Sequence, residues 1–281
     1  MTVAPQLTPT TSLVDAFRIL ALPEIHEAIS RARSLKLDPN PDAFHKLRIA
    51  LRRLRSLWWA YEPLLGKKHA ESRRDEFKGL ADAAGKTRDW DVLRELLTMN
   101  KRAPASFGEL VKPIDEHRAH TLAYSRAAIG NADVEQILES ALDQAIKQLA
   151  SASALPCLDE FARARIKSAE KKLGKRVKRA AKTEHEDYAT LHQVRIAGKK
   201  VRYLLEFFSP VLDGSHHPTI RKLASVQEEL GDLNDLVICE SLIRQYEFPP
   251  GTEILLTEVL KWLQHERRRR RDGAYVHLRH L

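Results

Sequence analysis

The chain has 281 residues, of which 43% are hydrophobic and 30% are charged, and its formal net charge is +9. This hydrophobic content allows a packed core and argues against disorder, while the excess of positive charge favours an anionic partner. The two cysteines, Cys157 and Cys239, lie far apart and outside any zinc-binding spacing, which predicts neither a disulfide framework nor a cysteine-based metal site. No apolar segment is long enough to span a membrane and the N-terminus lacks a secretory signal, so we expect a soluble cytoplasmic protein.

The residue usage predicts an all-α fold. Leu, Ala, Glu, Lys and Arg dominate, and alternating runs of β-branched residues are absent from the sequence. Pro63 and Gly66 close one predicted helix, and Pro210 and Gly214 close a later one. In chain order, the predicted helices cover residues 12–36, 42–62, 68–84, 89–100, 105–129, 133–150, 157–182, 187–209, 217–231, 233–246 and 253–272.

An internal repeat organises the chain. The segment FHKLRIALRRLRSLWWAYEPLL (44–65) aligns with LHQVRIAGKKVRYLLEFFSPVL (191–212). The identical pairs are His45/His192, Arg48/Arg195, Ile49/Ile196, Ala50/Ala197, Arg55/Arg202, Leu57/Leu204, Pro63/Pro210 and Leu65/Leu212. Downstream, GKTRDWDVL (85–93) aligns with GDLNDLVIC (231–239). The repeat predicts two related helical halves, residues 10–140 and 141–281.

Each copy of the repeat places a stripe of basic residues on one helix face, opposite an apolar face. At about 100° per residue, the stripe residues of each copy share an arc of about 80°. The two basic stripes are His45, Arg48, Arg52 and Arg55, and His192, Arg195, Lys199 and Arg202. A solvated helix face is the simpler interpretation of either stripe alone. Like-charged neighbours cost about 0.2–0.5 kcal/mol per pair, however, and both stripes lack acids, which favours an anion-binding surface. A stripe about 15 Å long suits a row of phosphates.

Other polar clusters have simpler interpretations. Arginine, rather than histidine or an acid, follows each stripe histidine at i+3, so no metal site is predicted. Four acids near the aligned glycines are expected to cap helices or pair with the stripes rather than to catalyse hydrolysis. They are Asp89, Asp91, Asp232 and Asp235. The run from Arg267 to Arg271 wraps a helix on all sides and is interpreted as a solvated helix end.

The doubled helix resembles the signature of the CHAD (conserved histidine α-helical domain) family. In that signature a histidine is followed by an arginine three residues later and by a basic cluster on the same helix, as in HKLR at 45–48 and HQVR at 192–195. The resemblance extends from about Ser12 over nearly the whole chain. It implies two helical bundles related by a pseudo-twofold axis, a central basic cavity and binding of inorganic polyphosphate. Many members carry an N-terminal triphosphate-tunnel (CYTH) domain, which the few residues before the first predicted helix leave no room for.

By this resemblance, we expect non-catalytic polyphosphate binding, with no cofactor and with association with polyphosphate granules. The expected binding residues are His45, Arg48, Arg52, Arg53, Arg55, His192, Arg195, Lys199, Lys200 and Arg202. Candidate outer contacts are Lys46, Arg165, Lys172, Lys175 and Arg176. Two alternatives stay open at this point: a nucleic-acid-associated basic helical protein, and a phosphohydrolase acting on polyphosphate. No nucleotide-binding or nucleophile motif is present in the sequence, which argues against an enzyme.

Overall fold

The computed structural model describes residues 7–37, 41–182, 188–214 and 216–278. Within these ranges the chain forms helices and no strand, which confirms the predicted all-α fold. The elements are α1 (Leu13–Leu37), α2 (Pro41–Leu65), α3 (Lys67–Ala83), α4 (Gly85–Met99), the short 3-10 helix η1 (Ala105–Leu110), α5 (Val111–Asn131), α6 (Val134–Ala150), α7 (Leu158–Ala180), α8 (Tyr188–Phe208), the 3-10 turn η2 (Ser209–Val211), α9 (His217–Gln245) and α10 (Glu253–Leu278). Among the helices in these ranges, none combines the length and apolar character needed to cross a bilayer.

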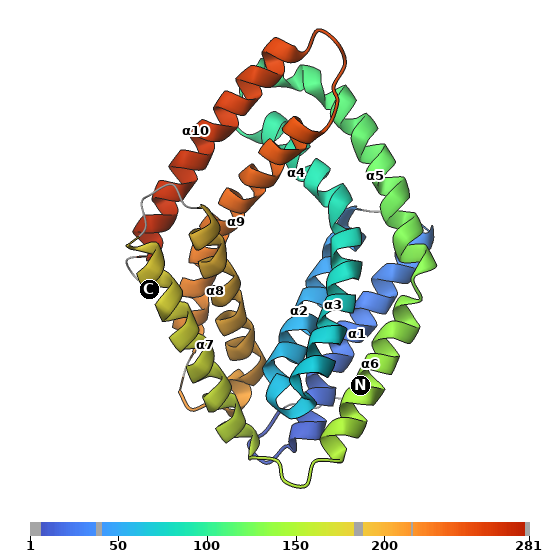
Figure 1. Cartoon of the computed structure of the whole chain (residues 1–281), viewed down its shortest axis with the longest axis vertical. Coiled ribbons are helices and arrows are strands. Elements are labelled where there is room, and N and C mark those ends of the chain that lie inside the picture. The colour runs from blue at the N-terminus through green and yellow to red at the C-terminus, as the bar shows by residue number, and fades with distance from the viewer. Residues whose placement is uncertain (1–6, 38–40, 183–187, 215, 279–281) are drawn as a thin grey trace.

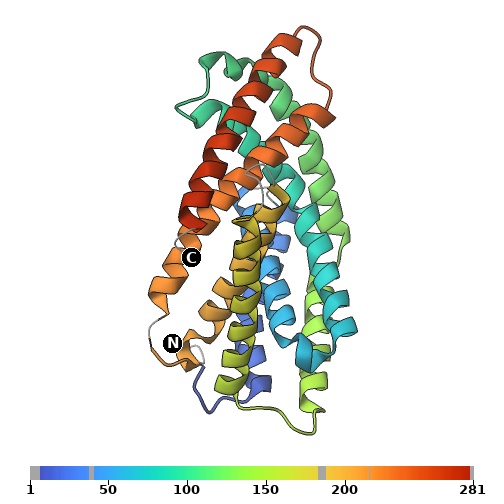
Figure 2. The same ribbon diagram turned by 60° about the vertical axis from the view of Figure 1, so that its left-hand side comes forward.

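The helices form two flanks of an elongated molecule (Figure 1). One flank holds α1, α2, α3, α5 and α6, and the other holds α7, α8, α9 and α10. The chain passes from one to the other through the loop after α6. The two flanks are in contact between α2 and α8. Helix α4, which follows α3 in the chain, contacts α9. The turned view shows α9 and α10, in orange and red, side by side in the upper half (Figure 2).

The apolar faces of α2 and α8 determine where their basic stripes point. Leu47, Leu51 and Trp58 on α2 are buried, as are Val201 and Phe208 on α8. Because a helical residue shares its face with positions three and four away, burying these side chains turns the opposite, basic side of each helix away from the core.

Two hydrophobic cores hold the flanks together, and each draws on both parts of the chain. The larger core contains buried side chains from α1, α2, α3, α6, α7 and α8, together with parts of α9 and α10. The second core lies between α4 and the C-terminal half of α9, and η1, α5 and α10 also contribute buried side chains to it. The pseudo-twofold relation and the division into residues 10–140 and 141–281 remain predictions.

Helix α9 differs from the predicted pair of helices at 217–231 and 233–246, because it continues without a break through Gly231. The aligned Gly85 begins α4, and one residue, Ala84, separates it from the end of α3. A helical glycine costs about 1 kcal/mol relative to alanine. Buried Leu230 and Leu233 on either side of Gly231 offset this cost by anchoring the helix on both sides of it.

Replacing Gly231 tests the continuity of α9. Gly231→Ala is expected to raise the free energy of unfolding by about 0.5–1 kcal/mol, because alanine favours the helix. A Cβ at this position has no described atom within 4 Å. Urea denaturation followed by circular dichroism measures the change. Gly66→Ala is the control and is expected to lose about 1 kcal/mol, since Gly66 has a φ of 71°. A loss of stability in Gly231→Ala would contradict a continuous helix.

Candidate anion-binding site

The two basic stripes meet at one pocket of about 390 Å³ between α2, α3 and α8. We call it the central pocket. It is lined by Arg52, Arg55, Ser56, Trp59, Arg74, Lys78, Asp82, His192, Arg195, Ile196, Lys199, Lys200 and Tyr203. Six predicted site residues therefore lie together: Arg52, Arg55, His192, Arg195, Lys199 and Lys200. Asp82 is the only acid among the lining residues.

Helix α3 adds two cations that the sequence analysis missed. Arg74 and Lys78 line the central pocket and are four residues apart, and Lys78 is one turn before Asp82. Arg74 donates a hydrogen bond to Glu62 Oε2 at 2.8 Å, and Lys78 Nζ lies 3.7 Å from Asp82 Oδ2. Acids interrupt the basic residues of α3, so its charge pattern is that of an ordinary solvated helix. The four-residue spacing was the signal available in the sequence.

Burial, together with neighbouring positive charge, lowers the pKa of the two pocket lysines. Burial, reinforced by Arg195, Arg52 and Arg202, lowers the pKa of Lys199 to about 7. Burial and then Arg74, Lys172 and Arg176 lower the pKa of Lys200 to about 8. The pocket thus disfavours its own charged lysines, and a bound anion would reverse that preference.

Several arginines of the pocket also hold donors without a protein partner. The Nε atoms of Arg52, Arg55 and Arg195 are buried and find no hydrogen-bond acceptor among the described residues. A buried donor without an acceptor costs about 1–3 kcal/mol. An anion in the central pocket could supply the missing acceptors, because each oxygen of a phosphate accepts hydrogen bonds.

The two stripe histidines occupy different environments. His192 lines the central pocket, and its Nδ1 lies 3.2 Å from the Tyr188 hydroxyl, which donates to Asn234 Oδ1 at 2.8 Å. Because the hydroxyl proton is used, Nδ1–H of His192 is the donor in that contact. Burial and Arg195 lower the pKa of His192. His45 is outside the pocket lining, and burial together with Arg88 lowers its pKa. Both histidines therefore charge only below their usual range.

Arg48 is not among the residues that line the central pocket. Its side chain contacts α4. Its Nη1 is 3.5 Å from the Gly85 carbonyl oxygen and 3.9 Å from Asp89 Oδ1. A Cβ on Gly85 would lie 3.1 Å from the Arg48 guanidinium carbon, so glycine permits this close approach. Burial raises the pKa of Asp89 to about 6; Arg48 opposes the rise and Asp235 adds to it. The aligned acids of the two repeats thus approach each other beside Arg48.

A family model for the CHAD domain matches residues 21–244 of the chain. The chain belongs to the CHAD family. The match spans both repeat copies, so it includes every residue of the central pocket.

Solved structures show the same fold. The crystal structure of the CHAD domain from the plant Ricinus communis aligns with a TM-score of 0.83 and 23% identity, covering 99% of this chain and 96% of that one. PptA from Streptomyces chartreusis aligns with a TM-score of 0.68 and 15% identity, covering 96% of this chain and 99% of that one. No curated protein matched this CHAD domain.

Two predicted site residues of the CHAD domain are paired with acids outside the pocket lining. Arg53 forms ion pairs with Glu24 on α1 and, at 2.8 Å, with Glu206 on α8. Its guanidinium also lies 5.3 Å from the Phe207 ring centre. Arg202 Nε lies 3.6 Å from Glu206 Oε1. Arg53 thereby links α1, α2 and α8, whereas the pair of Arg202 with Glu206 lies within α8.

The candidate outer contacts of the CHAD domain separate into three groups. Lys46 pairs with Asp42 at 2.7 Å, away from the pocket. Arg165 donates to the Trp59 carbonyl oxygen at 2.8 Å and lies over the Trp59 ring. The others, Lys172, Lys175 and Arg176, line two further pockets between α7 and α8.

Two of the four candidate acids of the CHAD domain lie near stripe arginines, whereas the other two pair with arginines outside the stripes. Asp89 lies near Arg48, Asp91 pairs with Arg118, and Asp232 pairs with Arg270 at 2.9 Å. The negative charge of Asp235 acts on Arg195. Among the described residues, no group of three or more His, Cys, Asp and Glu is placed to hold a metal ion.

The arginine run of α10 is not a simple solvated helix end. Arg267 pairs with Glu240 at 2.8 Å, Arg269 with Glu266 at 2.7 Å, and Arg270 with Glu229 at 3.3 Å. Arginines 267 and 270 thus link α10 to α9. Acids on α9 pair with arginines that the sequence pattern alone predicted to be exposed to solvent.

The aligned pair Arg53 and Lys200 gives a matched test of this arrangement. Arg53→Ala is expected to lower the free energy of unfolding by about 2 kcal/mol, because it leaves two half-buried carboxylates without a cation. Lys200→Ala is expected to change stability by less than about 0.5 kcal/mol, since it removes a lysine whose charge the pocket disfavours. Chemical denaturation of both variants measures the difference. Equal losses would contradict the division of roles.

Proposed function

We propose that this CHAD domain binds inorganic polyphosphate in the central pocket and catalyses no reaction on it. The convergence of α2, α3 and α8 carries the proposal. Together they line one pocket with Arg52, Arg55, Arg74, Lys78, Arg195, Lys199 and Lys200. Such crowding destabilises the protein alone and is offset when a multivalent anion binds. The proposal places the protein in the cytoplasm, at polyphosphate granules.

The shape of the pocket favours polyphosphate over nucleic acid. The cations lie between three helices, in a pocket of about 390 Å³, rather than along one protruding surface. A polyphosphate chain carries charge without sugars or bases, so it can enter such a space. A DNA duplex keeps its phosphates on a rigid helix and would reach only cations at the pocket rim.

The surroundings of the acids support binding without hydrolysis. Asp82, the acid in the pocket, lies 3.7 Å from Lys78, and Asp89 lies behind the pocket beside Arg48. General base catalysis needs a carboxylate within hydrogen-bond reach of an attacking water. Asp82 instead lies beside Lys78, and Asp89, whose pKa burial raises to about 6, is outside the pocket lining.

Removing the converging cations tests the proposed site. The variant with Arg52, Arg55, Arg195 and Lys199 all changed to Ala is expected to bind polyphosphate at least about a hundredfold more weakly, because each charge-assisted hydrogen bond contributes about 1.5–3 kcal/mol. Fluorescence anisotropy with labelled polyphosphate measures the affinity. The control changes Lys67, Lys147, Lys167 and Lys178 to Ala; these exposed residues lie outside the pocket. Equal affinity for both variants would refute the site.

Two further readouts of the same experiment test the alternatives. Duplex DNA is added at equal phosphate concentration, and displacement of polyphosphate would favour a nucleic-acid-binding protein. Phosphate release from short polyphosphate is followed with a divalent metal present, and release that depends on the protein would favour a phosphohydrolase. We expect no displacement and no release.

Binding is expected to weaken as the pH rises from 7 to 9. A bound polyanion raises the pKa of Lys199 and Lys200 above their free values of about 7 and about 8. The affinity is therefore highest at pH values below the pKa of the lysines in the free protein. It falls as the pH rises toward their pKa in the complex. We expect a loss of at least about tenfold between pH 7 and pH 9, with proton uptake on binding at pH 8. Calorimetry in buffers of different ionisation enthalpy measures that uptake.

The control for the pH dependence replaces both lysines with arginine. Lys199→Arg/Lys200→Arg keeps the charge and removes the titration, because arginine stays protonated over this pH range. The groups acting on Lys199 are Arg52, Arg195, Arg202 and Asp235, and those acting on Lys200 are Arg74, Lys172, Arg176 and Glu62. An unchanged pH profile in the double variant would exclude the two lysines as its source.

A further inference from the structure

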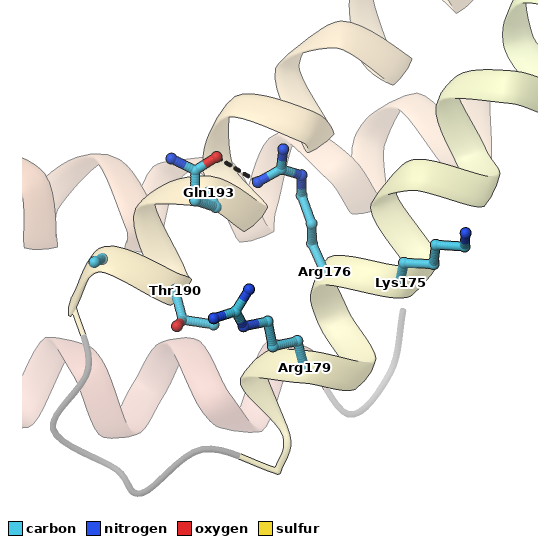
Figure 3. A pocket seen from close by; sticks show the side chains of 6 residues that line it. Lys175, Arg176, Arg179, Thr190 and Gln193 are labelled. Atoms are coloured by element: carbon cyan, nitrogen blue, oxygen red, sulfur yellow. Dashed lines mark hydrogen bonds between the residues drawn. The ribbon is translucent and has the colours of Figure 1, made fainter.

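A groove between α7 and α8 continues from the central pocket. Its outer part is a pocket of about 370 Å³, lined by Lys175, Arg176, Arg179, Ala189, Thr190 and Gln193. Figure 3 shows Arg176 and Arg179 reaching from α7 toward α8, where Arg176 donates a hydrogen bond to Gln193. We call this region and the small pocket beside it the α7–α8 groove.

The groove and the central pocket are connected through shared residues. A small pocket of about 40 Å³ lies between them. It shares Trp59, Ile196 and Lys200 with the central pocket. It shares Arg176 with the outer pocket. The three pockets therefore adjoin one another around α8, from the side that carries Arg195 and Lys199 to the side that carries Gln193.

Positive charge is continuous along this path. Lys172, Arg176 and Lys200 line the small pocket, and no acid is among the residues that line it or the outer pocket. The Trp59 ring supports the junction, with Lys200 Nζ at 4.5 Å and Lys172 Nζ at 5.9 Å from its centre. A cation over an indole face is held in place by the ring quadrupole without losing its charge.

In the first copy of the repeat, acids balance the cations at the equivalent positions. There, α1 packs on α2 as α7 packs on α8. Glu24 of α1 pairs with Arg53, the residue aligned with Lys200. Lys46, aligned with Gln193, pairs with Asp42. The basic path therefore leaves the central pocket on the α7 side.

We propose that the α7–α8 groove is a second polyphosphate subsite, which receives the part of a long chain that extends out of the central pocket. The inference rests on the proposed function, because the chain must first occupy the central pocket. The affinity for polyphosphate then depends on chain length. Inorganic tripolyphosphate contacts the central pocket alone, whereas long-chain polyphosphate also contacts Lys172 and Arg176.

The test compares two ligands and three proteins. Affinities of tripolyphosphate and long-chain polyphosphate are measured for the full chain, for Lys172→Ala/Arg176→Ala and for Lys167→Ala/Lys178→Ala. The last variant removes the same charge from the roughly opposite face of α7, at exposed positions that line none of the three pockets. Circular dichroism verifies that each variant is folded.

The groove variant is expected to bind long-chain polyphosphate at least about tenfold more weakly. The slope of its log affinity against log salt concentration is expected to be less steep by about one to two. Its affinity for tripolyphosphate is expected to stay within about twofold. The control variant should match the unmodified chain for both ligands. Gln193→Lys adds a cation to the groove and is expected to raise the affinity for the long chain alone.

The outcomes separate this inference from the proposed function. If the unmodified chain binds neither ligand, the proposed function itself fails. If it binds both and the groove variant binds the long chain as tightly, the groove is no subsite and the central pocket remains. If the groove variant loses both ligands equally, or the control loses as much long-chain affinity, the effect is general and the inference is overturned.

Discussion

Mutual repulsion among the cations of the central pocket is the constraint on which this structure depends. Helices α2, α3 and α8 place these cations together although no local interaction favours that. What holds them is the opposite side of each helix: Trp58, Phe77 and Phe208 are all buried in the larger core. Trp58 contacts Phe77 edge-on, with ring centres 5.1 Å apart. Burial of large apolar side chains is worth enough to offset several like-charge contacts.

The repeat accounts for the similar sequences of α2 and α8, but aligned residues of the two helices have different partners. Aligned residues no longer do the same thing: Arg53 is balanced by two carboxylates, while Lys200 lies in the pocket over Trp59. Glu24 on α1 and Glu206 on α8 place Arg53 in structural ion pairs, whereas the aligned Lys200 lines the central pocket. The aligned helices α2 and α8 thus differ in the acids around them, and the basic path continues along the α7 side. Structural likeness between the copies therefore does not imply equal ligand contacts.

Periodicity in the sequence was sufficient to predict the helices and the stripes, because both depend on residues within a few turns of one another. It could not identify the partners of those residues. Arg53 has the pattern of a binding residue, and only the distant Glu24 and Glu206 show otherwise. The cations of α3 were missed because acids separate them in the sequence. The break predicted at Gly231 was wrong because the burial of its neighbours outweighs the weak helix propensity of glycine.

The second core has a role in the site although it lies beyond it. Trp90 and Leu236 are buried there, and each directly follows an acid of the repeat, Asp89 and Asp235. Packing of these side chains fixes the backbone of α4 and α9 where the helices touch. The two carboxylates are thereby held near Arg48 and Arg195 in spite of their own repulsion, which contributes to the raised pKa of Asp89. The negative charge of Asp89 and Asp235 thus partly offsets the repulsion among the arginines of α2 and α8.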